Sequence, residues 1–284
     1  MKPKPIALIT GATSGIGEAT AYRLQDKGYA VFAAGRNPEA LDNLRSRGLQ
    51  ARALDVTDEA AVTRLVEEIN TDHGGVDVLV NSAGYPLPCP LEQVALGELR
   101  RLFETNVVAT LHLSQAVLPG MRARGAGRII TIGSTGGRFT SPGAGAYHVV
   151  KYGVEALSLS LGAEVARFGV RVVLIDPTGV RTPFVTSQFE TVHSYPDDDP
   201  YGEFKRRYAE TTRKLTKTPG TMVDADTVAR AVIRAVQAKN PKPRYIVGAS
   251  GKASVLARLL LTDRMWERVM TKGFKARIPL VRRA

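Results

Sequence analysis

The chain has 284 residues, of which 44% are hydrophobic and 23% charged, a balance typical of a folded globular protein. Its single cysteine, Cys89, excludes an internal disulfide, and its four scattered histidines show no metal-ligand spacing, so we predict no metal site. The net charge of +12 is weak evidence for nucleic-acid binding, because seven of those charges arise in residues 252–284, which hold nine Lys/Arg and two Asp/Glu.

The first apolar run, Ile6–Ile9, is too short to be the apolar region of a secretory signal. No stretch reaches the length needed to span a bilayer. We therefore expect a cytoplasmic protein in a reducing compartment.

Short apolar stretches alternate with helical patterns along the chain. Strands are expected at Ile6–Thr10, Ala30–Gly35, Gln50–Asp55, Val76–Asn81, Arg128–Ile132, Val170–Asp176 and Tyr245–Val247. Helices are expected at Gly15–Lys27, Pro38–Arg47, Asp58–His73, Leu99–Arg124, Tyr147–Phe168 and Asp226–Ala238. The alternation predicts a single α/β domain: a doubly wound, Rossmann-like parallel sheet of about seven strands with helices on both faces.

Residues 182–222 break this alternation, because they show no clear core pattern and several prolines interrupt them. An irregular insertion after a strand's carboxyl end favours a substrate flap. We assign residues 1–250, flap included, to the NAD(P)-binding domain and 251–284 to a basic amphipathic extension of it. The extension could lie on an anionic membrane, but packing against its own domain or a partner subunit is favoured.

A glycine-rich turn joins the first strand to the first helix. Glycines permit a tight turn and close backbone approach, and the helix N-terminus offers free N–H groups to a pyrophosphate. Glycine in a loop is weak evidence by itself, but the position between strand and helix favours a dinucleotide site. We expect cofactor contacts from Thr10, Gly11, Thr13, Ser14, Gly15, Ile16 and Gly17.

The second strand is followed by Arg36, where NAD-binding sites usually place an acid. A guanidinium can pair with a 2′-phosphate, and Ser14 could add a hydroxyl, so NADP(H) is predicted; the alternative is a solvated arginine. Asp55 could accept a hydrogen bond from the adenine amine or cap the next helix, and both readings stay open. Further cofactor contacts are expected from Val56, Asn81, Ala83 and Gly84.

Tyr147 and Lys151 are four residues apart and therefore share one face of a helix. Reduction of a ketone needs a proton donor, and oxidation of an alcohol needs the reverse step. A phenol pKa near ~10 is too high for a good base, but a neighbouring Lys151 cation and an oxidised nicotinamide would lower it. Since this spacing is common by chance, its meaning depends on the residues around it.

Two other polar residues could complete a reacting centre. Ser134, at the end of the fifth strand, could hold the substrate oxygen beside the phenol, or it could be a turn serine. Asn106, inside a helical run, could link to Lys151 through a water as a proton relay, or it could face solvent.

Together these motifs resemble the short-chain dehydrogenase/reductase family over Pro5–Tyr245. Tyr147–Val149 and Asp176–Thr182 are most similar to its 17β-hydroxysteroid dehydrogenase-like and retinol dehydrogenase-like branch. The resemblance implies a catalytic tetrad. In it, Asn106 positions water and Ser134 orients the oxyanion. Tyr147 transfers the proton, and Lys151 lowers the phenol pKa while contacting the ribose. It also implies nicotinamide contacts from Pro177, Gly179, Val180 and Thr182, and an NADP(H) preference marked by Arg36.

The chain departs from the family pattern at three positions. Ser82 replaces a second Asn, and Val150 replaces a small hydroxyl residue before the lysine. Thr178 replaces the Gly that usually follows Pro177, which could alter the turn that presents Val180 and Thr182.

The sequence therefore predicts an NADP(H)-dependent oxidoreductase that interconverts a secondary alcohol and a ketone or aldehyde. Apolar loop residues favour a lipophilic substrate: Tyr85, Leu87, Phe139, Phe184 and Val185. The alternatives are a ketoreductase of acyl-carrier-protein or other acyl thioesters, and a non-catalytic NADP(H) sensor or scaffold. We expect a homodimer or homotetramer and no nucleic-acid partner.

Overall fold

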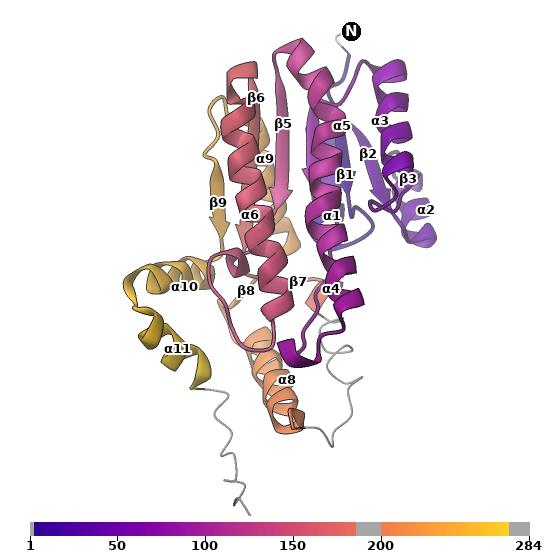
Figure 1. Ribbon diagram of the computed structural model, residues 1–284. Helices are drawn as coiled ribbons and strands as arrows, with labels where there is room; N and C mark the ends of the chain where they lie inside the picture. The colour runs from indigo at the N-terminus through magenta and orange to yellow at the C-terminus, as the bar shows by residue number, and fades with distance from the viewer. Residues whose placement is uncertain (1–2, 186–199, 273–284) are drawn as a thin grey trace, which may run out of the picture.

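The structure is a computed structural model that describes residues 3–185 and 200–272. Seven strands form one sheet in the order β3-β2-β1-β4-β5-β6-β9 (Figure 1). Each neighbouring pair runs parallel. The strands are β1 Ile6–Thr10, β2 Ala30–Gly35, β3 Gln50–Ala53, β4 Val78–Asn81, β5 Gly127–Ile132, β6 Val170–Pro177 and β9 Arg244–Val247. The predicted fold class is confirmed.

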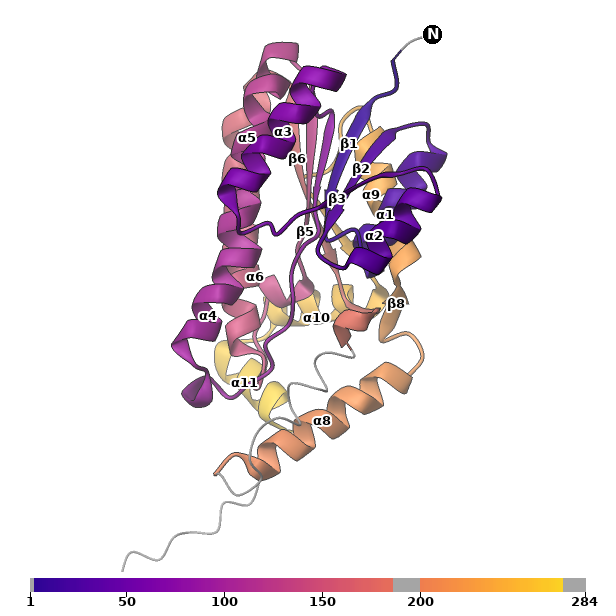
Figure 2. The same cartoon turned by 90° about the vertical axis from the view of Figure 1, so that its right-hand side faces the viewer.

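Helices cover both faces of this sheet (Figure 2). One face carries α1 Gly15–Asp26, α2 Pro38–Ser46 and α9 Ala225–Gln237, and the other carries α3 Glu59–His73, α5 Ala109–Arg124 and α6 Gly145–Val165. Two apolar cores result, because successive strand residues point to opposite faces. In β1, Ala7 and Ile9 enter one core while Ile6 and Leu8 enter the other. The strands therefore read as continuous apolar runs.

The strand order reverses between β1 and β4, which are neighbours in the sheet although β2 and β3 lie between them in the chain. Connections that leave such a pair in opposite directions open a crevice at the carboxyl edge of the sheet. The segments predicted to bind a cofactor follow β1, β2, β4, β5 and β6. Because the strands are parallel, all of these segments meet at that one edge.

The helix predicted over Leu99–Arg124 is not continuous. Helix α4 spans Leu96–Phe103, a π-helical turn (η2) spans Glu104–Val108, and α5 follows from Ala109. Asn106 lies in the π turn, where its side-chain amide donates to the Leu102 carbonyl oxygen at 3.0 Å. Such single-turn insertions are frequent at functional sites, because they re-aim a side chain.

Residues 182–222 and their borders contain more regular structure than the irregular flap expected. Strand β7 (Gly179–Arg181) pairs with β8 (Met222–Asp224), and α8 spans Gly202–Lys217. The apolar periodicity of α8 is weak because half of its residues are charged and its inward face is buried through Gly202, Lys205 and Ala209. The part of the flap at 186–199 lies outside the described residues.

The chain continues from β9 into α10 (Ala249–Leu260) and α11 (Asp263–Thr271). Short 3-10 turns η1, η3 and η4 occupy Leu91–Gln93, Thr135–Gly137 and Ala166–Phe168. Residues 273–284 of the predicted extension lie outside the described part of the chain. The other predicted helices and strands differ from the observed ones by a few residues at their ends.

Candidate functional site

The turn after β1 has the geometry of an anion-binding loop. Gly11 and Gly15 have φ values of 64° and 56°, which side-chain-bearing residues rarely adopt. Ser14 precedes α1 without capping it through its side chain, so that hydroxyl is not used by the helix. The first N–H groups of α1 point out of the helix at this end, and the helix dipole favours an anion there. The loop fits the pyrophosphate predicted for it.

The third glycine of the loop is fixed by a backbone contact. A Cβ added at Gly17 would lie 2.3 Å from the Gly11 carbonyl oxygen, which is closer than any real contact. We expect Gly17→Ala to displace the loop and weaken NADPH binding by about tenfold to a hundredfold, the cost of one charge-assisted hydrogen bond. Titration of nicotinamide fluorescence measures the dissociation constant. Gly97→Ala is the control, since a Cβ at Gly97 meets no atom within 4 Å; equal binding by both variants would contradict the expectation.

Thr10 and the loop after β4 hold each other in place. The Thr10 hydroxyl oxygen accepts from the backbone N–H groups of Ser82 and Ala83 at 3.2 and 3.4 Å. Asn81 is buried at the end of β4, and its amide approaches the Ser114 hydroxyl at 3.5 Å. At Ser82, where the chain departs from the family pattern, it is therefore the backbone that contacts Thr10.

Arg36 and Asp55 lie together at the ends of β2 and β3. The Arg36 guanidinium is 3.4 Å from the Asp55 carboxylate, and the Arg36 side chain is 74% exposed. Backbone and hydroxyl hydrogen bonds from Thr57, with a smaller contribution from Arg36, hold the pKa of Asp55 below its usual value. The helix-cap reading of Asp55 is wrong, because α3 is capped by Asp58, which accepts from the Ala61 N–H at 2.9 Å.

Tyr147, Ser134 and Lys151 meet at the ends of β5 and α6. The Ser134 side chain lies near enough to the Tyr147 hydroxyl to lower its pKa, and the Lys151 ammonium lies 5.6 Å from the centre of the Tyr147 ring. Ser134 also accepts from the Gly136 N–H at 3.0 Å, so its capping role and its contact with the phenol coexist. The buried Lys151 donates to the Ile132 carbonyl oxygen at 3.2 Å.

The electrostatics of this pair differ from the expectation. Burial raises the pKa of Tyr147 to about 12, because the neighbouring Ser134 side chain offsets only part of the desolvation cost. Burial also lowers the pKa of Lys151 to about 8, although the Asp176 carboxylate opposes this shift. Lys151 is not among the groups that lower the Tyr147 pKa here. In the protein alone, Tyr147 is thus a protonated phenol at neutral pH, ready to act as an acid.

Asn106 presents an unused acceptor beside this centre. Its Oδ1 is buried and has no hydrogen-bond partner in the described part of the chain. A Cβ added at Gly84 would lie 2.8 Å from that oxygen, so the glycine leaves room in front of it. A buried amide oxygen without a partner indicates a missing donor such as water. The solvent-facing reading of Asn106 is wrong.

His148 is a site residue that the sequence reasoning missed. Its Nε2 accepts from the Ser141 N–H at 3.0 Å, so Nδ1 carries the proton that is donated to the Gly136 carbonyl oxygen at 2.7 Å. Burial lowers its pKa, which keeps the ring neutral. His148 therefore ties residues 136–141 of the pocket wall to α6. In the sequence, the only indication of this role for His148 was its position next to Tyr147.

A buried ion cluster behind β5 was also missed. Arg244 lies 3.0 Å from the Asp176 carboxylate and 2.6 Å from that of Glu155, which Arg138 also pairs with at 3.0 Å. Burial raises the pKa of Asp176 to about 7 in spite of Arg244. A Cβ on Gly133 would lie 2.2 Å from Asp176 Oδ1, so this carboxylate packs directly behind the strand end that carries Ser134. These residues are 17 to 106 positions apart, and only the fold brings them together.

The segment after β6 returns to the glycine-rich turn. The unusual Thr178 donates its backbone N–H to the Val247 carbonyl oxygen at 2.9 Å, and its hydroxyl contacts that of Ser250 at 3.0 Å. β7 then pairs with β8. A Cβ on Gly15 would lie 3.0 Å from the Thr182 methyl group, so Thr182 packs against the loop. Thr178 is thus accommodated by a contact with α10 that the sequence did not reveal.

One cavity of about 860 Å³ connects these parts. Its walls include Arg36 and Asp55 at one end, Ser134, Tyr147 and Lys151 in the middle, and Phe139, Phe184 and Val185 at the other. The volume lies at the upper end of the range for ligand sites. Leu87, expected in the substrate pocket, instead packs in a small core with Leu102 and Val150.

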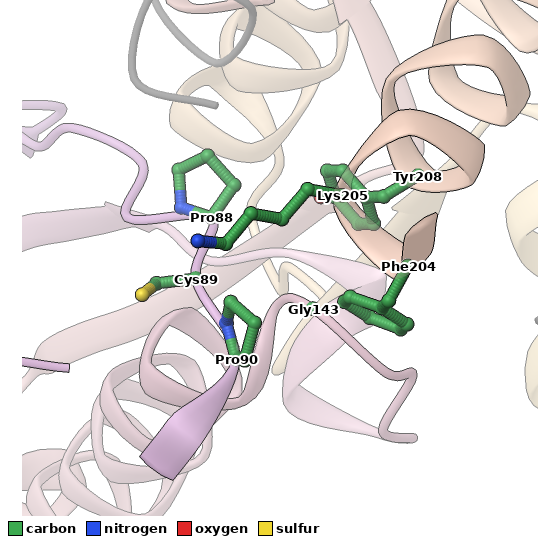
Figure 3. Close-up of a pocket in the computed structure, with 7 residues that line it drawn as sticks. All are labelled: Pro88, Cys89, Pro90, Gly143, Phe204, Lys205 and Tyr208. Atoms are coloured by element: carbon green, nitrogen blue, oxygen red, sulfur yellow. The ribbon is translucent and has the colours of Figure 1, made fainter. Parts of the chain in front are cut away.

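Helix α8 encloses the apolar end of the cavity. Figure 3 shows its Phe204, Lys205 and Tyr208 against Pro88–Pro90 and Gly143. Tyr208 and Leu215 also line the large cavity, and the Phe184 ring lies 5.8 Å from that of Tyr147. The predicted flap thus contributes a well-formed helix to the pocket.

Residues 3–185 and 200–272 contain no group of three or more His, Cys, Asp or Glu arranged to hold a metal ion. Within the same residues, no helix combines the length and hydropathy of a membrane span.

Comparison with known proteins places this geometry among dehydrogenases. Residues 5–193 match the family model described as short chain dehydrogenase. Over 278 residues the chain is 33% identical to an NADPH-dependent 3-dehydrocapnine reductase of Ornithobacterium rhinotracheale, covering 95% of this chain and 97% of the relative. A 3-ketodihydrosphingosine reductase of Bacteroides thetaiotaomicron is 32% identical over 248 residues, covering 87% and 89%. The crystal structure of an actinorhodin polyketide ketoreductase with NADPH superposes with a TM-score of 0.73 at 31% identity, covering 87% and 97%.

Proposed function

The chain belongs to the short-chain dehydrogenase family, and we propose that it is an NADPH-dependent reductase that converts a lipophilic ketone or aldehyde to the alcohol. The observation that carries the proposal is the single cavity that joins a phosphate-binding loop to a buried Tyr147 and an apolar end. NADPH, when bound, supplies the hydride. Its fit is supported by the loop that only glycine can form at Gly17 and by the exposed Arg36 guanidinium at the ribose end.

The reacting residues have separable tasks in this proposal. Ser134 and the Tyr147 hydroxyl hold the carbonyl oxygen, and Tyr147 gives that oxygen its proton. The high pKa of Tyr147 favours the reductive direction, since the phenol enters the reaction protonated. Lys151 holds the cofactor ribose and replenishes the proton, with Asn106 Oδ1 accepting from a bridging water.

The cofactor contacts proposed from the sequence remain those of the loop, the strand ends and Pro177–Thr182. In support, the cavity lining includes Gly11, Thr13, Ser14, Gly15, Ile16, Val56, Ala83, Gly84, Pro177, Gly179, Val180 and Thr182. Thr10, Gly17 and Asn81 do not line it; they are buried behind it and shape the loops. For these three we propose an indirect role.

The expected substrate is apolar because the cavity lining beyond Tyr147 includes Phe139, Phe184, Val185 and Leu215. Two relatives are named as reductases of 3-dehydrocapnine and 3-ketodihydrosphingosine, which supports a keto group as the reacting centre. The placement in the hydroxysteroid and retinol dehydrogenase-like branch, and in the cytoplasm, stays a prediction.

An assay of NADPH consumption against a graded series of carbonyl compounds tests the function. We expect kcat/KM to rise with the alkyl chain length of 3-keto substrates. Preference for acyl thioesters over free ketones would favour the acyl-carrier ketoreductase, an alternative supported by the likeness to a polyketide ketoreductase. Absence of turnover with both NADPH and NADH across the series would favour the non-catalytic sensor.

Arg36→Asp tests the cofactor assignment. The guanidinium pairs with the 2′-phosphate, whereas a carboxylate repels it and accepts from the free ribose hydroxyls of NADH. We expect the ratio of kcat/KM for NADPH over NADH to fall by about a hundredfold, the value of a charge-assisted pair plus the repulsion that replaces it. Arg64→Asp, on the exposed side of α3, makes the same change in net charge. An equal change in this NADPH-over-NADH ratio in both variants would show that Arg36 does not bind the 2′-phosphate.

The predicted homodimer or homotetramer has a suitable surface on α6. Its outward face carries exposed Val149, Tyr152 and Leu159, and Gly145–Val165 holds no exposed Lys or Arg. Interfaces between identical subunits are apolar and poor in charge. We propose that a second copy of the chain covers this face.

A further inference from the structure

Helices α10 and α11 carry a second apolar surface, which differs from that of α6. On α10, Leu256, Leu259 and Leu260 are exposed, the last two at 68% and 75%. On α11, Met265 and Val269 are exposed and lie one turn apart. We name these five residues the outer leucine face. So many exposed apolar side chains within residues 256–269 are unusual for a surface without a ligand or partner.

Both helices are anchored to the domain through other side chains. Val255 is buried under α10, and the Ser250 hydroxyl donates to the Thr221 carbonyl oxygen at 3.0 Å. Trp266 is buried under α11, with its ring centre 5.4 Å from that of Phe139 and its indole N–H donating to the Thr140 carbonyl oxygen at 3.2 Å. The helices therefore cannot turn their outer leucine face inward without losing these contacts. Of the two favoured expectations, packing on its own domain or on a partner subunit, the first holds for Val255 and Trp266 but not for the exposed leucines.

Basic residues accompany the outer leucine face. Residues 252–272 include five Lys/Arg and two Asp/Glu, and residues 273–284, outside the described part, add four Lys/Arg and no acid. Lys252, Arg264, Arg268 and Lys272 are exposed beside the apolar side chains. Exposed apolar side chains flanked by cations are typical of helices that lie in the interface of an anionic bilayer. The charge-poor face of α6 has the opposite character and fits a second subunit.

We propose that the outer leucine face, with its flanking cations, binds the surface of anionic phospholipid bilayers. The leucines insert at the acyl boundary, and the cations contact phosphate groups. Figures 1 and 2 show α10 and α11 at the carboxyl end of the sheet, next to α8. Ser250 and Ser254 of α10 line the large cavity, and Trp266 of α11 supports Phe139 in its wall. Bound in this way, the protein holds its substrate cavity next to the membrane; the binding itself does not depend on the proposed reaction.

Sedimentation of the full chain with vesicles tests this proposal. We expect binding to phosphatidylglycerol vesicles, at least about tenfold weaker binding to phosphatidylcholine vesicles, and a loss of affinity with added salt. The variant L259Q/L260Q should reduce the affinity for phosphatidylglycerol by about tenfold or more. The matched control is L91Q/L96Q, which alters two leucines of similar exposure (62% and 65%) that lie outside α10 and α11. We expect the binding of R264Q/R268Q to phosphatidylglycerol vesicles to depend less on salt than that of the wild-type chain.

Three outcomes would overturn the proposal: no sedimentation of the wild-type chain with phosphatidylglycerol, equal loss of binding in both leucine variants, or equal affinity for the two lipids. A second copy could instead cover the outer leucine face. In that case L259Q/L260Q would lower the molar mass measured by light scattering, and the wild-type chain would not bind vesicles. Turnover of a short, water-soluble ketone serves as the folding check, since these leucines lie outside the cavity.

Discussion

Replacing Tyr147 by Phe is expected to lower kcat by about a thousandfold while leaving the NADPH dissociation constant nearly unchanged. General acid catalysis typically contributes about a hundredfold to ten-thousandfold, and the change removes only the oxygen that carries the proton. The Ser134 hydroxyl stays in place to hold the substrate oxygen, so KM should change little. Stopped-flow measurement of hydride transfer, with fluorescence titration of NADPH, separates chemistry from binding.

Tyr152→Phe is the matched control for this change. Tyr152 lies on the same helix, one residue after Lys151, but its side chain is exposed on the outer face of α6. Its hydroxyl therefore has no route to the substrate, and we expect wild-type kcat. A Tyr147→Phe enzyme with kcat within about threefold of wild type would exclude Tyr147 as the proton donor.

Replacing Lys151 by Met is expected to lower kcat/KM for NADPH by about a hundredfold to a thousandfold, the usual loss when one preorganised donor is removed from an active site. Met preserves the length and the apolar part of the buried side chain but removes the ammonium. The Ile132 carbonyl oxygen also loses its donor. The effect should appear in cofactor affinity as well as in turnover, because the ammonium serves the ribose and the proton path.

The pH dependence gives Lys151 a second signature. Its pKa is lowered by burial to about 8, so the ammonium is present below that pH and is lost as the pH rises through it. Since kcat/KM for NADPH reports groups of the free enzyme, the wild-type value should fall about tenfold per unit above pH ~8. The Lys151→Met enzyme should lack this alkaline limb.

The control is Lys205→Met, at the other lysine buried among the described residues. Lys205 lies on α8 beside Pro88–Pro90, away from the cofactor end, so the alkaline limb should persist in that variant. A limb that survives in Lys151→Met, or disappears in Lys205→Met, would assign the ionisation to another group.

Sequence periodicity predicted the sheet because each strand is buried on both faces and has to be apolar throughout. It missed α8, whose charged sequence hides an inward face of Gly202, Lys205 and Ala209. It also joined α4 and α5, because a π turn inserts one residue without interrupting the helical pattern. The readings of Asp55 and Asn106 stayed open for a similar reason. Residue type alone did not separate a helix cap from an adenine contact at Asp55, or a proton relay from a solvent-facing side chain at Asn106. The capping of α3 by Asp58 excluded the cap reading, and the burial of Asn106 excluded the solvent-facing one.

The sequence by itself determined the fold class, the position of the glycine-rich turn and the pairing of Tyr147 with Lys151, because these depend on local spacing and on which side chains avoid water. The tertiary structure decided the protonation of that pair, since desolvation by surrounding residues moves the pKa of Tyr147 up and that of Lys151 down. It also decided which side of the basic extension is apolar and exposed. Periodicity shows that a helix has an apolar face, but only the packing of Val255 and Trp266 shows which apolar residues remain outside.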